Sequence, residues 1–514
     1  MTKLAEQLIQ PEILTLLRRH AGNREIWLVG GALRDHFLGR SRPDLDFVVD
    51  REAAKLARLL SDDLQAGFHS LDDERDAARV ILPNLAGTLD FVRRAGTSIE
   101  TDLRERDFTI NALALSLVGD ERLIDPLGGL QDLKDRRLRP CAKEAVARDP
   151  VRALRAVRLA AELGLRMEPE TVEQVRAAGD HLAGVSAERV RDEFMRMLEP
   201  SIARTAVRLM DHLGLLIRVC PELDQLPGSE HSARERSLST LDRLAELVHL
   251  LGLRTDRKRD GNLALAEVAL QLGKFRAGLS AHLEARLRGG RRVAQLLSLA
   301  ALYLPSEGSF EPSTASAVSS GVAELALRRG LELRLSRPEA VRIQTIVLNY
   351  RRLVKFSTSG PPSDGEVYRF FRASGEAGIE LVILYLAASL ALLGSAPDPV
   401  EWRSRIAIAR SLFQAWFERG ELVVRPRKLI TGDELATALG LQAGKIIGDL
   451  LEAIREGQAD GRVHDRDSAI QLARLQLDSA QARLPNGRPS EVTDKAQSGW
   501  VRKNSGSEAD ENTQ

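Results

Sequence analysis

Two short stretches decide how the chain begins to fold: Gly30-Gly31-Ala32-Leu33-Arg34-Asp35 and Asp44-Leu45-Asp46-Phe47-Val48-Val49. The apolar run at 26–29 leads into the glycine pair, which predicts a strand, a tight turn and a helix over 32–38. The second stretch predicts another strand. Asp44 and Asp46 lie two residues apart in it, so their side chains point to the same face.

The surrounding sequence extends this pattern into a small α/β unit with a mixed sheet. Further strands are predicted at 79–82, 88–92 and 122–124, and helices at 52–64 and from Asn111 to Leu117. From Asp149 to about residue 478 nearly everything has helical periodicity. The predicted fold class is therefore α+β, a small mixed-sheet head followed by an extended all-helical neck, body and tail.

Length and composition exclude several kinds of protein. With 514 residues the chain exceeds what one hydrophobic core usually organises. A net charge of +1 excludes a global polycation, and 4% aromatic residues argue against a large base-stacking platform. Two cysteines cannot form a disulfide framework, which favours a cytoplasmic protein. The longest uncharged apolar run, 381–393, is shorter than the roughly 20 residues of a membrane span and predicts a buried helix.

The aspartate pair and the glycine pair together indicate phosphate chemistry. Asp44 and Asp46 would repel each other, and a divalent cation such as Mg²⁺ removes that conflict with hard carboxylate ligands and substrate phosphates. Gly30 and Gly31 let the backbone approach a phosphate closely, and Arg34 follows one turn later. These parts suit phosphoryl or nucleotidyl transfer. Asp90, in the strand at 88–92, is either a third ligand, a general base or a hydrogen-bonded edge residue.

A second polar pattern follows at the start of the helical region. Asp149, Arg152, Arg155 and Arg158 recur every three residues, which predicts one slanting stripe on a helix. An Asp accepts from an exocyclic amine and an Arg donates to ring acceptors, so such a pair reads the edge of a base. A solvated face of ion pairs is the alternative for an isolated arginine stripe.

Taken together, these stretches resemble the class II tRNA nucleotidyltransferases and bacterial poly(A) polymerases. The other segments that carry the resemblance, in the same order, are Arg106-Asp107-Phe108-Thr109-Ile110-Asn111-Ala112-Leu113-Ala114, Ile124-Asp125-Pro126-Leu127-Gly128-Gly129 and Asp149-Pro150-Val151-Arg152-Ala153-Leu154-Arg155-Ala156-Val157-Arg158. The resemblance implies a nucleotidyltransferase that extends a tRNA 3′ end from CTP and ATP with Mg²⁺.

The resemblance also assigns roles to single residues. Asp44 and Asp46 would bind the metal, with Asp90 as a further catalytic carboxylate. The remaining set would bind the nucleotide: Gly30, Gly31 and Arg34 at the triphosphate; Arg106, Asp107 and Asn111 at the ribose; Asp149 and Arg152 at the base; and Arg155 and Arg158 in the same pocket.

Domain limits follow from the same comparison of segments. We expect a catalytic head at 1–140, a base-reading neck and RNA-binding domain at 141–225, an HD-like helical domain at 226–400, a C-terminal helical domain at 401–484 and a disordered tail at 485–514. Arg236 and Leu304-Pro305 stand where an HD domain needs metal ligands. That domain is therefore interpreted as structural, and metal phosphohydrolase activity lacks its ligands.

Three departures from the family pattern affect the functional prediction. Arg148 replaces the usual Glu before Asp149, and Glu105 replaces an Arg before Arg106. Only thirteen residues separate Arg93 from Asp107, where complete CCA-adding relatives carry a longer loop. The short form resembles relatives that add only CC. The alternatives are a poly(A) polymerase and an RNA-binding protein with a weakened active site.

Overall fold

The computed structural model describes residues 3–40, 44–83, 87–226, 230–253, 263–304, 315–394, 397–442 and 444–482. The chain divides into two compact units, Met1–Arg425 and Pro426–Gln514. The tail predicted at 485–514 lies outside the described residues. The finer domain limits given above remain predictions.

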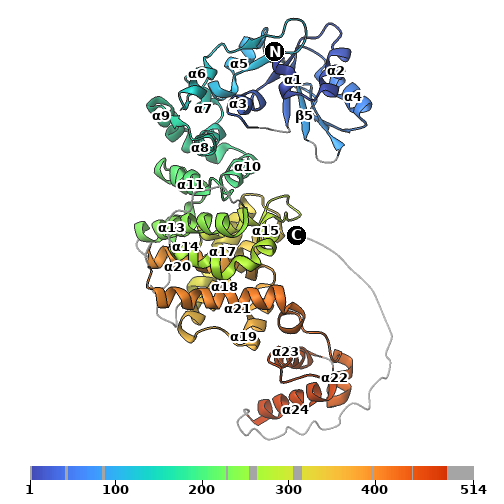
Figure 1. Ribbon diagram of the computed structural model, residues 1–514, viewed down its shortest axis with the longest axis vertical. Helices are drawn as coiled ribbons and strands as arrows, with labels where there is room; N and C mark the ends of the chain where they lie inside the picture. The colour runs from blue at the N-terminus through green and yellow to red at the C-terminus, as the bar shows by residue number, and fades with distance from the viewer. Residues whose placement is uncertain are drawn as a thin grey trace, which may run out of the picture. The chain divides into compact units, whose positions relative to one another are not determined.

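The first unit opens with a mixed sheet, drawn in blue in Figure 1. It has seven strands in the order β3-β4-β5-β2-β1-β6-β7. The β2–β5 pair is parallel, and the other neighbouring pairs are antiparallel. The strands are β1 Ile26–Val29, β2 Leu45–Val49, β3 Gly67–Asp72, β4 Ala77–Ile81, β5 Thr88–Arg93, β6 Ala114–Ser116 and β7 Leu123–Ile124. The predicted α+β class with a mixed sheet is confirmed.

Helices cover both faces of this sheet but leave part of one face exposed. Phe47 and Phe91 stack at 4.9 Å between ring centroids, on the face where α4 packs. On the other face, Val48 packs with Ile99 and Leu103 of α5. Asp46 lies on that second face and stays exposed. The helices of this region are α1 Leu4–Leu8, α2 Pro11–His20, α3 Gly31–Phe37, α4 Ala53–Leu64, α5 Ile99–Arg104 and α6 Gly129–Lys134.

Two local predictions in this region differ from the structure. Residues 111–117 do not form a helix, because a single 3₁₀ turn at Thr109–Asn111 leads into β6, which pairs with β1. The apolar run 112–117 meets an open sheet edge, and that pairing outweighs the helical pattern. Strand β3 was not predicted, since its exposed polar residues lack an apolar alternation.

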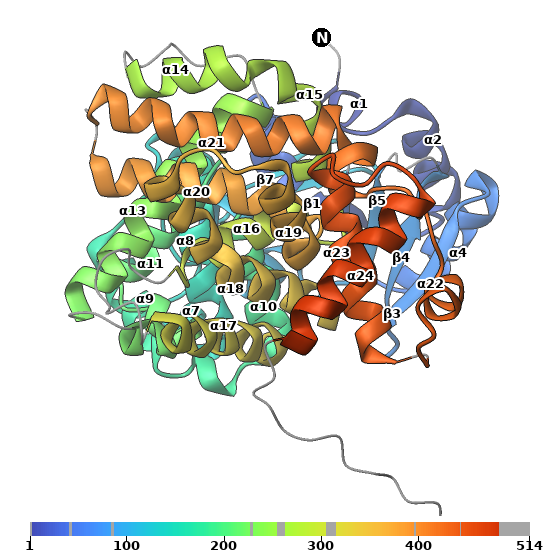
Figure 2. The same ribbon diagram turned by 90° about the horizontal axis from the view of Figure 1, so that it is seen from below.

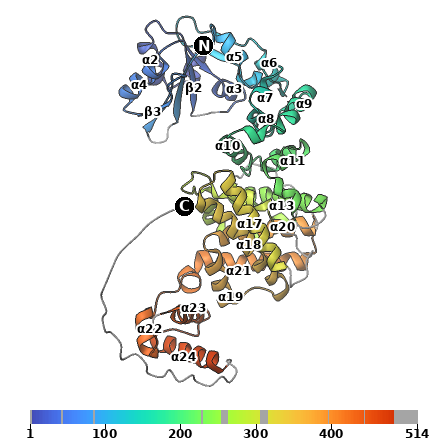
Figure 3. The ribbon, with the colours of Figure 1, turned by 180° about the vertical axis from the view of Figure 1, so that it is seen from behind.

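A group of helices follows the sheet and lies beside it in the first unit (Figure 3). Helix α8, Val151–Leu163, packs against α9, α10 and α11. The small parallel pair β8–β9 joins residues 137–138 to 166–167. The other helices here are α7 Ala145–Arg148, α9 Pro169–Gly179, α10 Ala187–Met197, α11 Ala203–His212 and α12 Leu216–Val219.

The rest of the first unit is helical, and α20 packs against both α13 and α21 (Figure 2). The helices are α13 Glu230–Val248, α14 Leu263–Leu272, α15 Arg276–Glu284, α16 Val293–Ala301, α17 Ala315–Glu332, α18 Arg337–Ser359, α19 Asp364–Ser374, α20 Ala377–Leu393 and α21 Pro399–Glu418. The apolar run at 381–393 belongs to α20, whose side chains are almost all buried, as predicted. Among the described helices none alone has the length and hydropathy of a membrane span; α19 and α20 reach them only jointly, across a 107° bend.

The second unit has a core of its own. Helices α22 Gly432–Leu439, α23 Lys445–Ala459 and α24 Arg466–Ala482 enclose buried residues that include Leu435, Leu450 and Ile454. Thr431 caps α22 and accepts a hydrogen bond from the backbone N–H of Glu434. Each helix contributes buried apolar residues to this core.

Candidate active site

Three carboxylates and one guanidinium share one face of three neighbouring strands. In the sheet register Asp46 lies opposite Asp90, and Asp90 lies opposite Arg79 of β4. Residues directly opposite each other point to the same face. Asp44 is on this face too, since Leu45 between the aspartates is buried while Asp44 and Asp46 are exposed. The predicted shared orientation of Asp44 and Asp46 is therefore observed.

Each flanking carboxylate has defined partners. Asp44 Oδ1 accepts hydrogen bonds from the backbone N–H and hydroxyl of Thr88, at 3.1 and 2.9 Å. Both oxygens of Asp90 accept from the Arg79 guanidinium at 2.7 Å. Asp90 is thus part of a bidentate ion pair with Arg79. The exposed Asp44 and Asp46 lie on the side of Asp90 that faces away from Arg79.

The turn at Gly30 and Gly31 lies beside the Asp46 side chain. Gly30 has φ +74°, a conformation that favours glycine. A Cβ at this position would lie 3.8 Å from Asp46 Oδ2 and 3.3 Å from Nη1 of Arg106. Gly31 opens α3 directly after the turn. The missing side chain therefore keeps backbone, carboxylate and guanidinium close together.

Arg34 is directed into the protein. Its side chain is buried, pairs with Asp35 at 2.8 Å and donates to Asn111 Oδ1 at 2.6 Å. Asn111 in turn donates to Asp107 Oδ1 at 3.0 Å. The structure therefore brings together residues predicted for the triphosphate and for the ribose.

Asp107 is buried and fully partnered. Besides Asn111, the backbone N–H of Phe108 donates to it at 2.7 Å, and Arg155 pairs with it at 3.1 Å. Burial acts to raise the pKa of Asp107, but the Arg155 charge and these hydrogen bonds outweigh it, and the pKa is lowered. Asp107 is therefore held as a carboxylate.

The predicted stripe on the helix after residue 149 is only partly correct. Arg152, Arg155 and Arg158 are on α8, but Asp149 precedes the helix with φ −143° and ψ 91°. The reason is Pro150, because a residue before proline is restricted to extended conformations. Asp149 pairs instead with Arg189 of α10, at 2.6 Å, and more distantly with Arg152, at 3.7 Å.

Arg152 is oriented by backbone groups. Its guanidinium donates to the carbonyl oxygens of Glu105, Arg106 and Ala145 at 3.1 to 3.2 Å. Arg148, which stands at the position of the family's Glu, is exposed and lies 3.7 Å from Glu144. The three carbonyls thus fix the arginine that the resemblance assigns to the base.

Sequence reasoning missed Glu193 of α10, which is 5% exposed. It accepts from Arg155 at 3.0 Å and from Arg158 at 2.7 Å, one arginine on each oxygen. Burial acts to raise the pKa of Glu193, but the two arginines lower it overall. Its only signal in the sequence is a Glu in the amphipathic stretch 187–197.

Asp102 of α5 was also missed. It accepts from Arg106 at 3.1 Å and from the backbone N–H of Ala95 at 3.0 Å. Asp102 therefore fixes Arg106 beside Gly30. Its sequence signal is its position four residues before Arg106 on a short helix.

The carboxylates of Asp44 and Asp46 fit a hard divalent cation. Asp44 and Asp46 offer carboxylate oxygens, and Gly30 leaves space beside Asp46. Within the described residues, no three His, Cys, Asp or Glu side chains gather closely enough to hold a metal by themselves. Two carboxylates completed by phosphate oxygens is a usual arrangement for such cations at nucleotides.

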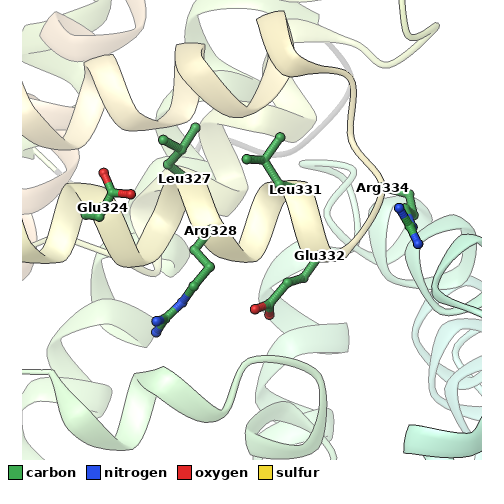
Figure 4. A pocket seen from close by; sticks show the side chains of 6 residues that line it. All are labelled: Glu324, Leu327, Arg328, Leu331, Glu332 and Arg334. Atoms are coloured by element: carbon green, nitrogen blue, oxygen red, sulfur yellow. The ribbon is translucent and has the colours of Figure 1, made fainter. Parts of the chain in front are cut away.

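Other parts of the described chain lack comparable chemistry. The hollow on α17 shown in Figure 4 is lined by Glu324, Leu327, Arg328, Leu331, Glu332 and Arg334, none of which is a predicted site residue. His464-Asp465 lies in an exposed turn where Asp465 accepts from Ser468. Arg236 lies within α13, so no ligand replaces the expected histidine there.

Comparison with known proteins shows the family and the fold of the chain. Residues 26–139 match the family described as the poly A polymerase head domain, and residues 164–226 match the one described as the probable RNA and SrmB-binding site of polymerase A. A solved structure of a CCA-adding enzyme with ATP shares the fold, with a TM-score of 0.63 over 93% of this chain and 98% of that one, at 20% identity.

Full-length relatives give the family. A CC-adding tRNA nucleotidyltransferase of Geobacter sulfurreducens is 31% identical over 468 residues, 91% of this chain and 95% of the relative. An A-adding tRNA nucleotidyltransferase of Deinococcus radiodurans is 30% identical over 447 residues, 85% of this chain and 92% of the relative. The chain therefore belongs to the class II tRNA nucleotidyltransferase family.

Proposed function

We propose that this protein adds nucleotides from CTP, or from CTP and ATP, to the 3′ end of tRNA without a nucleic-acid template. The observation that carries the proposal is the exposed pair Asp44 and Asp46 beside the Gly30 turn. It occurs in a chain that matches tRNA nucleotidyltransferases over most of its length. Since tRNA is matured in the cytoplasm, we propose that the protein works there.

In this reaction the RNA 3′-hydroxyl attacks the α-phosphorus of the nucleotide, a phosphodiester forms and pyrophosphate leaves. Asp44 and Asp46 would hold Mg²⁺, which when bound supplies charge neutralisation and activates the hydroxyl. Gly30 and Gly31 would bring the backbone close to the triphosphate. Arg34 would hold α3 in place behind this turn through its hydrogen bond to Asn111.

The ribose and base would be held by fixed polar groups. Asn111 donates a hydrogen bond to Asp107, and Arg106 lies beside Gly30. We assign these three residues to the ribose. Asp149 and Arg152 would present an acceptor and a donor edge to cytosine or adenine. Arg155 and Arg158 would act through Asp107 and Glu193 rather than by direct contact, because both are engaged in ion pairs.

We further propose that the protein adds only CC. In the structure the short segment before Asp107 is filled by α5, which Ser98 caps. The thirteen residues between Arg93 and Asp107 are therefore too few to include the longer loop of complete CCA-adding enzymes. A relative with 31% identity is named CC-adding, although another is named A-adding.

The test uses purified protein and a tRNA that ends at its discriminator base, with CTP alone, ATP alone or both. We expect a product two nucleotides longer with CTP and no further extension with ATP. A three-nucleotide product refutes CC-only addition, and a long ladder from ATP alone identifies a poly(A) polymerase. Asp46→Asn should abolish incorporation while tRNA binding persists. A wild-type protein that binds tRNA without any incorporation would indicate the weakened RNA-binding alternative.

The base-reading assignment has its own test. The double variant Asp149→Ala and Arg152→Ala removes both members of the proposed edge but leaves the aspartate row intact. Selection of CTP over ATP should fall by one to two orders of magnitude, because each good bidentate contact discriminates by about 1–3 kcal/mol. Misincorporation rates measured with each nucleotide give the ratio, and unchanged selectivity contradicts the assignment.

A further inference from the structure

The row of charged residues contains one member without a role so far, Arg79. It lies on β4, directly opposite Asp90, which lies opposite Asp46 on the next strand. Neighbouring strands are about 4.8 Å apart. The guanidinium therefore reaches Asp90 from the side away from Asp46, and all of these side chains are on one face.

The contact has the strongest geometry open to an arginine and a carboxylate. Nε and Nη2 of Arg79 donate to the two oxygens of Asp90, both at 2.7 Å. Arg79 remains 42% exposed and Asp90 25% exposed, so the pair is not a buried structural element. The hydrogen bonds to Asp90 raise the pKa of Arg79, and the charges of Asp44 and Asp46 add to this effect.

The consequence for cation binding is twofold. The three carboxylates carry three negative charges, and Arg79 cancels one of them. In addition, each oxygen of Asp90 accepts a hydrogen bond from Arg79, so a cation at Asp44 and Asp46 would have to compete with the guanidinium for Asp90. Without Arg79, a third ligand would lie one strand away from Asp46.

We propose that Arg79 is a positioning residue that keeps Asp90 out of the cation site and so leaves a site of two aspartates, which the nucleotide phosphates complete. This inference rests on the proposed function, since it concerns the same aspartates. It predicts that cation binding without nucleotide is weak because of Arg79. Cation binding then depends on the arrival of the nucleotide.

The experiment measures Mn²⁺ affinity of the full-length, nucleotide-free protein by electron paramagnetic resonance at low ionic strength. Arg79→Gln should bind Mn²⁺ about tenfold more tightly, because one unit charge at about 6 Å acts on a divalent cation. Arg79→Lys keeps the charge but loses the fork and frees one Asp90 oxygen, so it should also bind more tightly than wild type. The Arg79→Gln and Asp90→Asn double variant should return to the wild-type value.

Two controls separate the possible explanations. Arg75→Gln removes one charge from the β3–β4 turn, where Arg75 is 81% exposed and lies 3.7 Å from Asp72; it should leave the affinity within twofold of wild type. Asp46→Asn should weaken Mn²⁺ binding, and if it does not, the proposed cation site itself is wrong.

Several results would overturn the role of Arg79 while Asp46→Asn still weakens binding. They are unchanged affinity in Arg79→Gln, a wild-type value in Arg79→Lys, or a double variant as tight as Arg79→Gln. Thermal unfolding of each variant shows that the sheet is intact, so each affinity refers to folded protein.

Discussion

At the scale of single residues, the ion pairs around Glu193 distinguish the site from an ordinary charged surface. Arg155 connects Asp107 to Glu193, and Arg158 continues from Glu193 to Glu162. The pKa values of Asp107 and Glu193 are lowered in spite of burial. This geometry is maintained by charge, because each buried group has a partner of opposite sign.

Replacing Glu193 tests that interpretation. Glu193→Gln leaves two arginines facing a neutral group and should lower the free energy of unfolding by about 3 kcal/mol. Glu188→Gln is the matched control on the same helix, since Glu188 is 55% exposed and meets Arg334 at only 3.9 Å. It should change stability by no more than about 0.5 kcal/mol. Denaturant titration gives both values, and equal values would refute the role of Glu193.

The pH dependence of Glu193 has a defined sign. Its folded-state pKa lies below the ordinary value of 4.5, so the unfolded chain takes up the proton first as pH falls. The stabilisation is therefore complete above about pH 4.5 and is lost as pH falls through the folded value. Unfolding free energies from pH 6 to 3 should fall less steeply in Glu193→Gln than in wild type. Parallel curves would contradict this prediction.

At the scale of elements, the strands that carry the carboxylates were predictable from sequence. Residues 45–49 and 88–92 are apolar runs interrupted by one Asp each, and the strand period alone places Asp44 and Asp46 on one face. Which strands are neighbours is not encoded in any local pattern. The contact of Asp90 with Arg79 therefore needed the structure.

The errors had both local and distant causes. Asp149 left the predicted stripe because Pro150 restricts it, a signal that was present in the sequence. Arg189 of α10 lies 40 residues from Asp149. Two of the carbonyls that hold Arg152, those of Arg106 and Glu105, lie 46 and 47 residues from it. None of these contacts had a signal in the sequence. Residues 111–117 pair with β1 instead of forming a helix, because the sheet edge was available only after folding.

The close contact between α6 and the Thr109–Asn111 turn can be tested by adding one methyl group. A Cβ on Gly129, at the start of α6, would lie 2.1 Å from the carbonyl oxygen of Thr109 in the turn that carries Asn111. Gly129→Ala should therefore lower the free energy of unfolding by about 1–3 kcal/mol and displace Asn111. Reduced ribonucleotide preference, measured with CTP against dCTP, would report the displacement.

The matched control for this variant is Gly321→Ala. Gly321 lies within α17 with no atom within 4 Å of its added Cβ, so the substitution should stabilise the helix by about 0.5–1 kcal/mol. Equal effects of the two substitutions would show that the contact with Thr109 is not tight.

At the scale of the whole molecule, the chain contains two compact units, and the second has its own core. The second compact unit begins at Pro426, and the domain limit predicted at 401 stays a prediction. Most of the segment between these positions belongs to α21, where Trp402 is buried and donates to the carbonyl oxygen of Ala264 in α14.

Separate cores predict separate stability. Leu435 of α22 is 0% exposed, and Leu435→Ala should cost the second unit about 2–5 kcal/mol through lost burial and a cavity. In hydrogen exchange by mass spectrometry, amides of α22, α23 and α24 should exchange faster, while those of β1, β2 and β5 keep the wild-type rate. Leu475→Ala, at a position 59% exposed on α24, serves as control and should leave both units unchanged. If Leu435→Ala accelerated exchange equally in β2 and α23, the two units would unfold as one, and their separate cores would not correspond to separate cooperative units.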